Sequence, residues 1–260
     1  MIKAINAYIG YSNNIPILRN INLEINDNSV LIGPNGSGKT TFLNAVLGFS
    51  KVLKGKLLVF GIEVSNLRNF LGITSNIVDV YKILSVKIKE LVEIYAELYG
   101  VDKAEIFSTL RYFNFNSFDK KLHELSLGQQ KIIGNSLALA SNPKLALLDE
   151  PFENLDPTKR LKLIRMLTEF RKGKVILTSH EIDLVKKLKD WNLYLVFNGS
   201  IYGPFRASKI NELYISKGKI ENALFVINTN NGCFSITENQ GDLPLSSIGD
   251  IENLEVMLND

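Results

Sequence analysis

A glycine-rich octapeptide constrains the fold of this chain more than any other feature of the sequence. Residues 33–40 read Gly-Pro-Asn-Gly-Ser-Gly-Lys-Thr and match the pattern G-x-x-x-x-G-K-[ST] in full. The octapeptide follows the short apolar run Ser29–Ile32 and precedes a helical pattern that continues to about Gly48. The sequence therefore predicts a strand, a phosphate-binding loop and a helix in succession.

Each part of this loop has a predicted contact with a bound nucleotide. Glycines let backbone N–H groups curl around phosphate oxygens, and the start of the helix adds partial positive charge. Lys39 is predicted to reach the β- and γ-phosphates, and the Thr40 hydroxyl to ligate Mg²⁺. The other residues predicted to contact ATP here are Gly33, Asn35, Gly36, Ser37, Gly38 and Thr41. An ordinary glycine-rich turn is the alternative, and the flanking strand and helix disfavour it.

Two later segments carry groups that suit phosphate chemistry. In Leu125–Gln129, Ser126 and Gln129 have capping-box spacing, and a serine beside Gly128 at a helix start makes a second anion site. The apolar run 145–148 ends in Asp149 and Glu150, whose side chains leave a strand on opposite faces. Asp149 is thus predicted to hold the Mg²⁺ shell, and Glu150 to accept a proton from an attacking water.

These pieces, in this order, resemble the ATP-binding subunit of ABC (ATP-binding cassette) transporters over about residues 1–205. The resemblance implies that Asp156 lies in the D-loop and that His180 is a catalytic histidine that contacts the γ-phosphate. It also implies that Tyr11 stacks on adenine, a role for which Tyr8 competes. In this family two domains pair head to tail, so each ATP lies between one phosphate loop and the signature of the other domain.

One position departs from the family pattern. A glutamine that contacts Mg²⁺ and the attacking water normally precedes the helical insertion, yet this chain has no glutamine before Gln129. Alignment places Asn76 in that slot. We therefore predict that Asn76 joins Glu150, His180 and Lys39 in catalysis, and that it shares Mg²⁺ with Thr40 and Asp149. The alternative is that this loop supplies no ligand.

The order of patterns predicts an α/β fold with a P-loop NTPase core. Strands and helices alternate, which indicates a mostly parallel sheet, with an antiparallel β-subdomain. An all-helical signature subdomain is expected at about 77–142, inside an ATPase domain of residues 1–205. Residues 206–260 are expected to form a small α+β accessory region. This region should contain a helix at about 206–215 and a hairpin that turns at 230–232.

Composition excludes several classes of protein. Hydrophobic residues make up 45% of the chain, which is enough for a buried core, but no run approaches the about 18 apolar residues of a membrane span. The single cysteine excludes a disulfide framework within the chain. A net charge of +3 gives no reason to expect nucleic acid as a partner. We expect a cytoplasmic protein.

The resemblance also suggests a subgroup and a set of partners. The segment 96–101 and the closing segment 251–258 are similar to those of ABC-2-type exporters. The implied partners are a separate integral-membrane permease and a second ABC ATPase subunit, identical or different, so the chain would lie on the cytoplasmic face of the membrane. Two alternatives stay open: an ABC ATPase that moves no solute, and a weakly hydrolysing nucleotide-dependent regulator.

Overall fold

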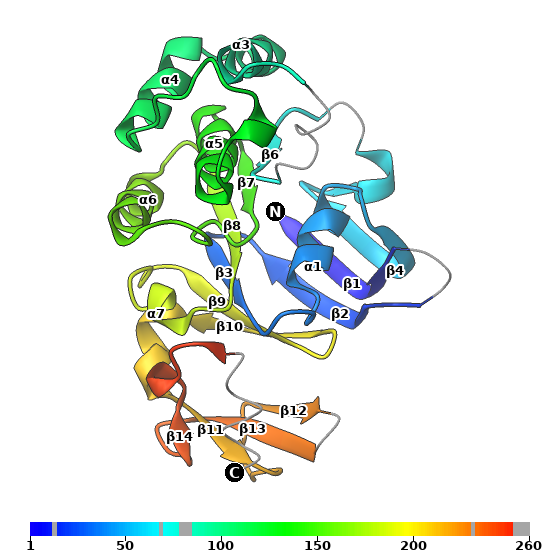
Figure 1. Ribbon diagram of the computed structural model, residues 1–260. Helices are drawn as coiled ribbons and strands as arrows, with labels where there is room; N and C mark the ends of the chain where they lie inside the picture. The colour runs from blue at the N-terminus through cyan, green and yellow to red at the C-terminus, as the bar shows by residue number, and fades with distance from the viewer. Residues whose placement is uncertain (12–14, 68–69, 78–84, 230–231, 252–260) are drawn as a thin grey trace. The chain divides into compact units, whose positions relative to one another are not determined.

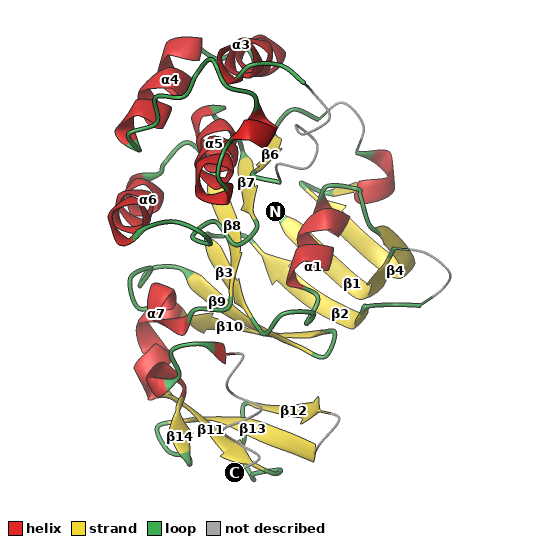
Figure 2. Cartoon of the chain, in the orientation of Figure 1, coloured by secondary structure: helices red, strands yellow, loops and turns green. Residues whose placement is uncertain are grey.

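The computed structural model describes residues 1–11, 15–67, 70–77, 85–229 and 232–251. The chain divides into two compact units. The first contains residues 1–68 and 178–260, and the second contains residues 69–177. Figure 1 follows the chain by colour, and Figure 2 marks its helices and strands.

The first unit begins with an antiparallel sheet. Its strands, in the order β2-β1-β4-β5, are β2 (Leu18–Ile25), β1 (Ile2–Gly10), β4 (Lys51–Val59) and β5 (Ile62–Glu63). The sheet confirms the expected antiparallel subdomain, and Ile21, Leu23 and Ile25 alternate with exposed polar residues along β2. Helix α1 (Lys39–Val46) packs near β1 and β4.

A second group of strands in this unit carries the phosphate loop. Strand β3 (Ser29–Ile32) pairs in parallel with β9 (Asn192–Phe197), and β9 pairs in antiparallel fashion with β10 (Ser200–Arg206). All four residues of β3 are buried, as the apolar run predicted. Burying each such aliphatic side chain contributes about 1.5–3 kcal/mol. The loop after β3 therefore starts from a fixed point in the core.

The described residues of the second unit combine a parallel sheet with four α-helices. Strand β7 (Leu145–Leu148) pairs in parallel with β6 (Ile73–Ser75) and with β8 (Lys174–Ser179), whose last two residues belong to the first unit. The helices are α3 (Ile88–Tyr99), α4 (Lys103–Tyr112), α5 (Leu127–Ala140) and α6 (Pro157–Glu169). No strand is described between α3 and α5, which agrees with the predicted helical insertion (Figure 2).

The ends of these helices are held by residue types that favour such positions. Gly100 ends α3 with a φ of 64°, a left-handed conformation that suits glycine. The Asp102 side chain caps α4 by accepting a hydrogen bond of 2.8 Å from the backbone N–H of Ala104. The predicted α/β fold with an antiparallel subdomain and a helical insertion is confirmed.

The C-terminal region corrects one prediction. Residues 207–212 form a 3₁₀ helix and residues 213–217 form strand β11 (Leu213–Lys217), so the helix expected at 206–215 was wrong. Leu213 and Ile215 alternate inward, and β11 pairs with β13 (Gly232–Glu238), which stabilises the extended form.

The same sheet runs in the order β12-β13-β11-β14, with β12 (Phe225–Thr229) and β14 (Leu243–Pro244) at its edges. Thr229 pairs with Gly232, although the predicted turn residues 230–231 lie outside the described residues. Residues 252–258 of the predicted closing segment also lie outside them. The predicted boundary between residues 205 and 206 stays a prediction.

The last described residues pair with the segment that follows β8. The backbone N–H of Ile251 donates to the carbonyl oxygen of His180 at 3.0 Å, and that of Ile182 donates to the carbonyl oxygen of Gly249 at 3.0 Å. Between them Glu181 and Asp250 form an antiparallel bridge. Ile182 begins the short helix α7 (Ile182–Val185). In the described part of the chain, no helix is both long enough and apolar enough to cross a bilayer.

Candidate nucleotide site

The phosphate loop has the backbone geometry that its glycines predict. Gly38 takes a φ of 110°, a conformation open to glycine but not to residues with a Cβ. A Cβ on Gly33 would lie 2.1 Å from the carbonyl oxygen of Val196, so no larger residue fits there. No side chain caps α1, whose first turn follows Gly38 directly. A helix start without a side-chain cap is a position at which proteins often bind an anionic ligand.

Two polar side chains of this loop are buried. Lys39 is 5% exposed, and its Nζ donates to the carbonyl oxygens of Gly33 at 2.7 Å and Pro34 at 3.1 Å. The Ser37 hydroxyl is buried with no hydrogen-bond partner among the described residues. A buried cation, an unpartnered hydroxyl and an uncapped helix start suit the polyphosphate of ATP.

Two of the predicted nucleotide contacts, Tyr11 and Thr41, lie side by side in the first unit. The Tyr11 hydroxyl accepts from Asn44 Nδ2 at 3.2 Å and from Thr41 Oγ1 at 3.4 Å, so its ring lies beside α1 and is 47% exposed. Tyr8, its competitor, instead lies under the Lys54 ammonium at 5.5 Å. An exposed ring next to the loop helix suits a stacking role.

His180 is tied to the phosphate loop through its neighbour in the chain. The backbone N–H of Gly33 donates to the carbonyl oxygen of Ser179 at 3.3 Å. The Nε2 atom of His180 lies 3.9 Å from a carboxylate oxygen of Asp250. The histidine thus has contacts with the C-terminal segment that the sequence did not indicate.

The signature residues form the start of α5. Ser126 Oγ accepts from the backbone N–H of Gln129 at 3.3 Å, and Gln129 Oε1 accepts from the backbone N–H of Ser126 at 3.1 Å. This reciprocal pair is the predicted capping box. A Cβ on Gly128 would lie 2.3 Å from the carbonyl oxygen of Asn154, which precedes Asp156 by two residues. Ser126 and Leu127 are both exposed.

Asp156 caps α6. Its carboxylate accepts from the backbone N–H of Lys159 at 2.9 Å, and the Lys159 ammonium lies 2.9 Å from it. The backbone hydrogen bond, followed by the contact with the Lys159 side chain, lowers the pKa of Asp156 below its ordinary value.

Asp149 and Glu150 follow β7 as predicted, and Glu150 has an unusual backbone. Its φ is 42°, in the left-handed region that residues with a Cβ rarely adopt. The backbone N–H of Glu153 donates to its carbonyl oxygen at 3.1 Å, which closes a turn after the strand. Such strain is typical of functional sites and persists only where the surroundings fix it.

Asn76 lies in the core, with 2% of its surface exposed. Its Oδ1 accepts from the backbone N–H of Asp149 at 2.7 Å. Its Nδ2 donates to the carbonyl oxygen of Asp149 at 3.1 Å and to Oδ1 of Asn135 at 2.8 Å. Both ends of the amide are therefore engaged, so the Mg²⁺ role predicted for Asn76 would require these bonds to open.

Two residues near this strand end escaped the sequence analysis. Asn135 is 1% exposed, and its Nδ2 donates to the carbonyl oxygen of Pro151 at 2.8 Å. The Lys131 ammonium donates to the carbonyl oxygen of Asp149 at 3.1 Å. The available signal was Asn135 itself, an amide within the apolar run of α5 from Ile132 to Ala140.

The predicted site residues divide between the two units. The first holds Tyr11, the loop residues 33–41 and His180. The second holds the remaining predicted residues: Asn76, Ser126, Gly128, Gln129, Asp149, Glu150 and Asp156. Among the described residues, no three His, Cys, Asp or Glu side chains cluster as a metal site would require.

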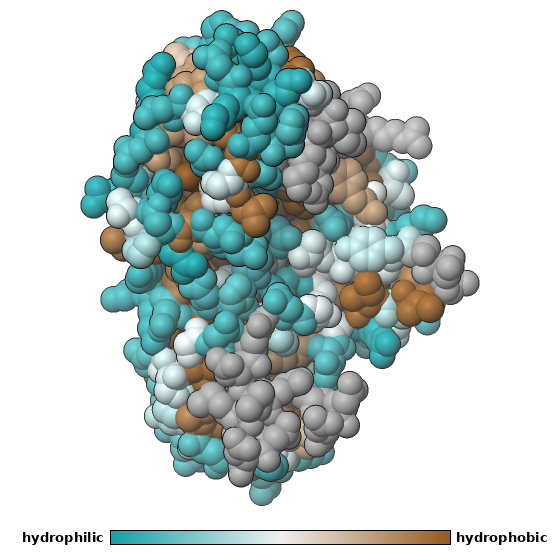
Figure 3. Space-filling model, viewed as in Figure 1, coloured by the Kyte–Doolittle hydropathy of each residue, from teal (hydrophilic) through white to brown (hydrophobic). Residues whose placement is uncertain are grey.

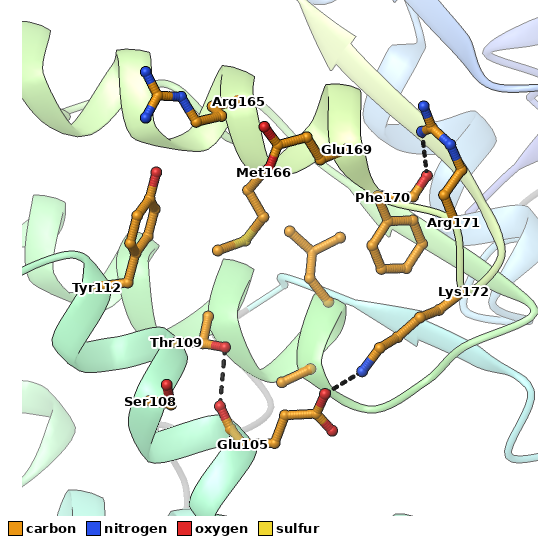
Figure 4. A pocket seen from close by; sticks show the side chains of 12 residues that line it. Glu105, Ser108, Thr109, Tyr112, Arg165, Met166, Glu169, Phe170, Arg171 and Lys172 are labelled. Carbon is orange, nitrogen blue, oxygen red and sulfur yellow. Dashed lines mark hydrogen bonds and ion pairs between the residues drawn. The ribbon is translucent and has the colours of Figure 1, made fainter.

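A cavity of about 610 Å³ in the second unit contains none of these residues. It lies among α4, the end of α5 and the end of α6 (Figure 4). The Lys172 ammonium reaches across its edge to Glu105, and Arg171 turns back to the carbonyl oxygen of Phe170. Since no predicted site residue lines it, this cavity is not part of the predicted nucleotide site.

The fold and the loop define an ATP-binding protein of the P-loop class. Residues 18–153 match the family model described as ABC transporter. The chain belongs to this family as an ATP-binding subunit, and such subunits are ATPases that dimerise and work with transmembrane partners.

Individual relatives agree with this assignment. An uncharacterized ABC transporter ATP-binding protein of Methanocaldococcus jannaschii is 30% identical over 245 residues, which are 82% of this chain and 81% of the relative. The lantibiotic transport ATP-binding protein SrtF of Streptococcus pyogenes is 30% identical, with 71% and 82% covered. A crystal structure provisionally named a cobalt transport ATP-binding protein is 32% identical, with a TM-score of 0.86 over 99% of this chain and all of that one.

Proposed function

We propose that this ATPase subunit binds and hydrolyses MgATP to drive a separate membrane permease, and that the transporter is an exporter. The observation that carries the proposal is the phosphate loop, in which a buried lysine, an unpartnered serine hydroxyl and an uncapped helix start lie together. The ABC-2-type exporter group is part of this proposal. The relatives do not distinguish it, since their names refer to lantibiotic and cobalt transport alike.

In this proposal the residues of the first unit bind the nucleotide. Lys39 and the N–H groups of the loop and α1 neutralise the phosphates, and Tyr11 stacks on adenine. Thr40 would hold Mg²⁺ together with Asp149. Bound Mg²⁺ would supply charge neutralisation for the phosphate oxygens. His180 would donate a hydrogen bond to the terminal phosphate.

The proton transfer falls to Glu150. Its carboxylate accepts a proton from the water that attacks the terminal phosphate, as a general base does. Ser126, with Gly128 and Gln129, would contact the ATP of a second subunit, and Asp156 would lie at the same interface. The exposure of Ser126 and Leu127 supports this role, because an interface with another copy needs accessible residues there.

The permease is proposed to dock on the helical insertion. Helix α3 exposes Ile94 and Leu98, which are four residues apart and thus on one face. Figure 3 shows a largely hydrophilic face with hydrophobic side chains in small separate groups. We propose that this exposed apolar pair contacts a helix of the membrane partner. The location proposed for the chain is therefore the cytoplasmic side of the membrane.

One observation favours a second candidate, a nucleotide-dependent regulator that hydrolyses slowly. The amide of Asn76 is engaged within the protein core rather than free to hold Mg²⁺ or water. Such a protein would bind ATP tightly and release it with little turnover.

The decisive experiment compares ATP binding and hydrolysis in the wild type and in Glu150→Gln. The variant should keep its ATP affinity and lose roughly 10²–10⁴-fold in turnover, which is the usual contribution of a general base. Near-normal hydrolysis by the variant would remove Glu150 from the mechanism. A wild type that binds ATP but turns over as slowly as the variant would favour the regulator.

A further inference from the structure

We propose that Asn76 and Asn135 form a buried amide clamp that positions Glu150 for hydrolysis, with Asn76 acting as a positioning residue instead of a Mg²⁺ ligand. The inference rests on the proposed role of Glu150 as the general base. It assigns a function to Asn135, which no sequence motif marked. All the residues of the clamp lie in the second unit.

The first half of the clamp extends the parallel sheet by one side chain. Strand β6 ends at Ser75, and its pairing with β7 continues through the backbone N–H of Asn76, which donates to the carbonyl oxygen of Leu147 at 3.3 Å. The Asn76 amide then binds both backbone polar groups of Asp149, the N–H at 2.7 Å and the carbonyl oxygen at 3.1 Å. The side chain thus replaces the backbone partner that a longer β6 would provide.

The second half fixes the other side of Glu150. Asn135 accepts from Asn76 through Oδ1 at 2.8 Å and donates through Nδ2 to the carbonyl oxygen of Pro151 at 2.8 Å. Asp149 and Pro151 are therefore both bound, and Glu150 is the residue between them. Its φ of 42° is held by fixed neighbours on each side.

Burial makes the clamp specific. Asn76 is 2% and Asn135 is 1% exposed, so water cannot readily replace a lost partner. A glutamine at position 76 would carry its amide one methylene further, past the backbone N–H and carbonyl oxygen of Asp149 that the asparagine reaches. The shorter amide suits the clamp, whereas the family glutamine suits a reach toward the metal.

The clamp predicts a loss in kcat with little change in KM for ATP. A misplacement of about 1 Å in a reacting group costs about 10²-fold in rate, so Asn135→Ala, Asn76→Ala and Asn76→Gln should each lower kcat about 10- to 100-fold. The Mg²⁺ concentration for half-maximal rate should stay at the wild-type value, because no metal ligand is removed. The double alanine variant should cost little more than either single variant, because both act through one unit.

Thr74→Val is the matched control. Thr74 is also buried, but its hydroxyl joins β6 to α5, where it donates to the carbonyl oxygen of Ala138 at 2.8 Å, rather than to the turn around Glu150. The control should lower the melting temperature while kcat stays at the wild-type value. A general loosening of the second unit would instead lower kcat in the control as well.

Hydrogen exchange of the nucleotide-free full chain provides a readout that needs no turnover. Asn76→Ala and Asn135→Ala should each accelerate exchange at the Asp149 and Glu153 amides about five- to tenfold, while Thr74→Val leaves these amides unchanged. Equal exchange in Asn135→Ala and the control would overturn the clamp. So would an Asn76→Gln variant that hydrolyses as fast as the wild type, or an Asn76→Ala variant rescued by added Mg²⁺. If Glu150→Gln hydrolyses normally, the proposed base is wrong, and the exchange rates still decide whether the clamp exists.

Discussion

At Glu150 the backbone takes a φ of 42°, which costs a residue with a Cβ on the order of 1–3 kcal/mol. Glycine would adopt this conformation without the penalty, yet it has no carboxylate. Glutamate at this position therefore lowers the stability of the fold but supplies the carboxylate. The strained conformation persists because Asp149 and Pro151 are bound on either side. The strain energy can be measured by comparing two variants at this position.

Glu150→Gly should be more stable than Glu150→Ala by about 1 kcal/mol, because only glycine relieves the left-handed strain. Both variants lack the carboxylate and should lose hydrolysis alike, so the comparison isolates the backbone. Urea denaturation measures the two free energies of unfolding. An alanine variant as stable as the glycine variant would show that the conformation at 150 is not strained.

Asp156 connects stability to pH. Its pKa lies below the ordinary value in the folded chain, so its carboxylate stabilises the fold above that ordinary pKa, and the contribution is lost as the pH falls through the lowered one. Asp156→Ala should cost about 1 kcal/mol at neutral pH, the usual effect of losing a helix cap. The difference in unfolding free energy between the variant and the wild type should narrow only once the pH falls below the ordinary pKa of 3.8 and through the lowered one.

Asp156→Asn is the control for this cap, because asparagine keeps an acceptor but does not titrate. It should retain most of the neutral-pH stability and show a flatter pH dependence than the wild type. A constant gap between Asp156→Ala and the wild type down to low pH would contradict the assignment.

At the scale of elements, sequence patterns predict the features that depend on neighbouring residues, such as helix caps. The capping box predicted at Ser126 depends on residues within one turn and is present, and the cap at Asp102 and the end of α3 at Gly100 are equally local. Strand β11 was missed because its partner β13 lies some twenty residues away. The Asn76–Asn135 contact spans 59 residues, so no local pattern could reveal it.

The pairing of residues 249–251 with 180–182 is a second long-range element contact, and its strength is testable. Ile251 is fully buried, and replacing a buried isoleucine with alanine costs about 2–5 kcal/mol where the site cannot collapse. Ile251→Ala should therefore accelerate exchange of the Ile182 amide, which donates to Gly249. Protection that matches the wild type would mean that the segment is held by other contacts. The amide of Ile176, in the core of β8, serves as the internal control.

At the scale of the whole molecule, the proposed reaction requires two copies of an ATP-binding subunit. Glu150→Gln should be a monomer without nucleotide and a dimer with MgATP, because unhydrolysed ATP would persist between a phosphate loop and a signature. Light scattering measures the mass in each state. A variant that binds MgATP and stays monomeric would contradict the head-to-tail arrangement.

Ser126→Arg in the Glu150→Gln background is the matched control for this experiment. The exposed serine caps its own helix, and a large cation there should block the partner's nucleotide while ATP still binds the phosphate loop of the same chain. The double variant should bind MgATP and remain a monomer. If it dimerises as the single variant does, the signature is not at the interface.

The C-terminal pairing also sets an order of events during synthesis. His180 leaves the ribosome about 70 residues before Ile251, the residue that binds its carbonyl oxygen. At roughly 5–20 residues per second, the segment around His180 waits about 4–14 seconds for this backbone partner. The phosphate loop emerges earlier still, but β9, the strand that pairs with β3, is complete only at Phe197. The loop therefore gains its partner strand after His180 has been made and before Ile251 binds the histidine segment.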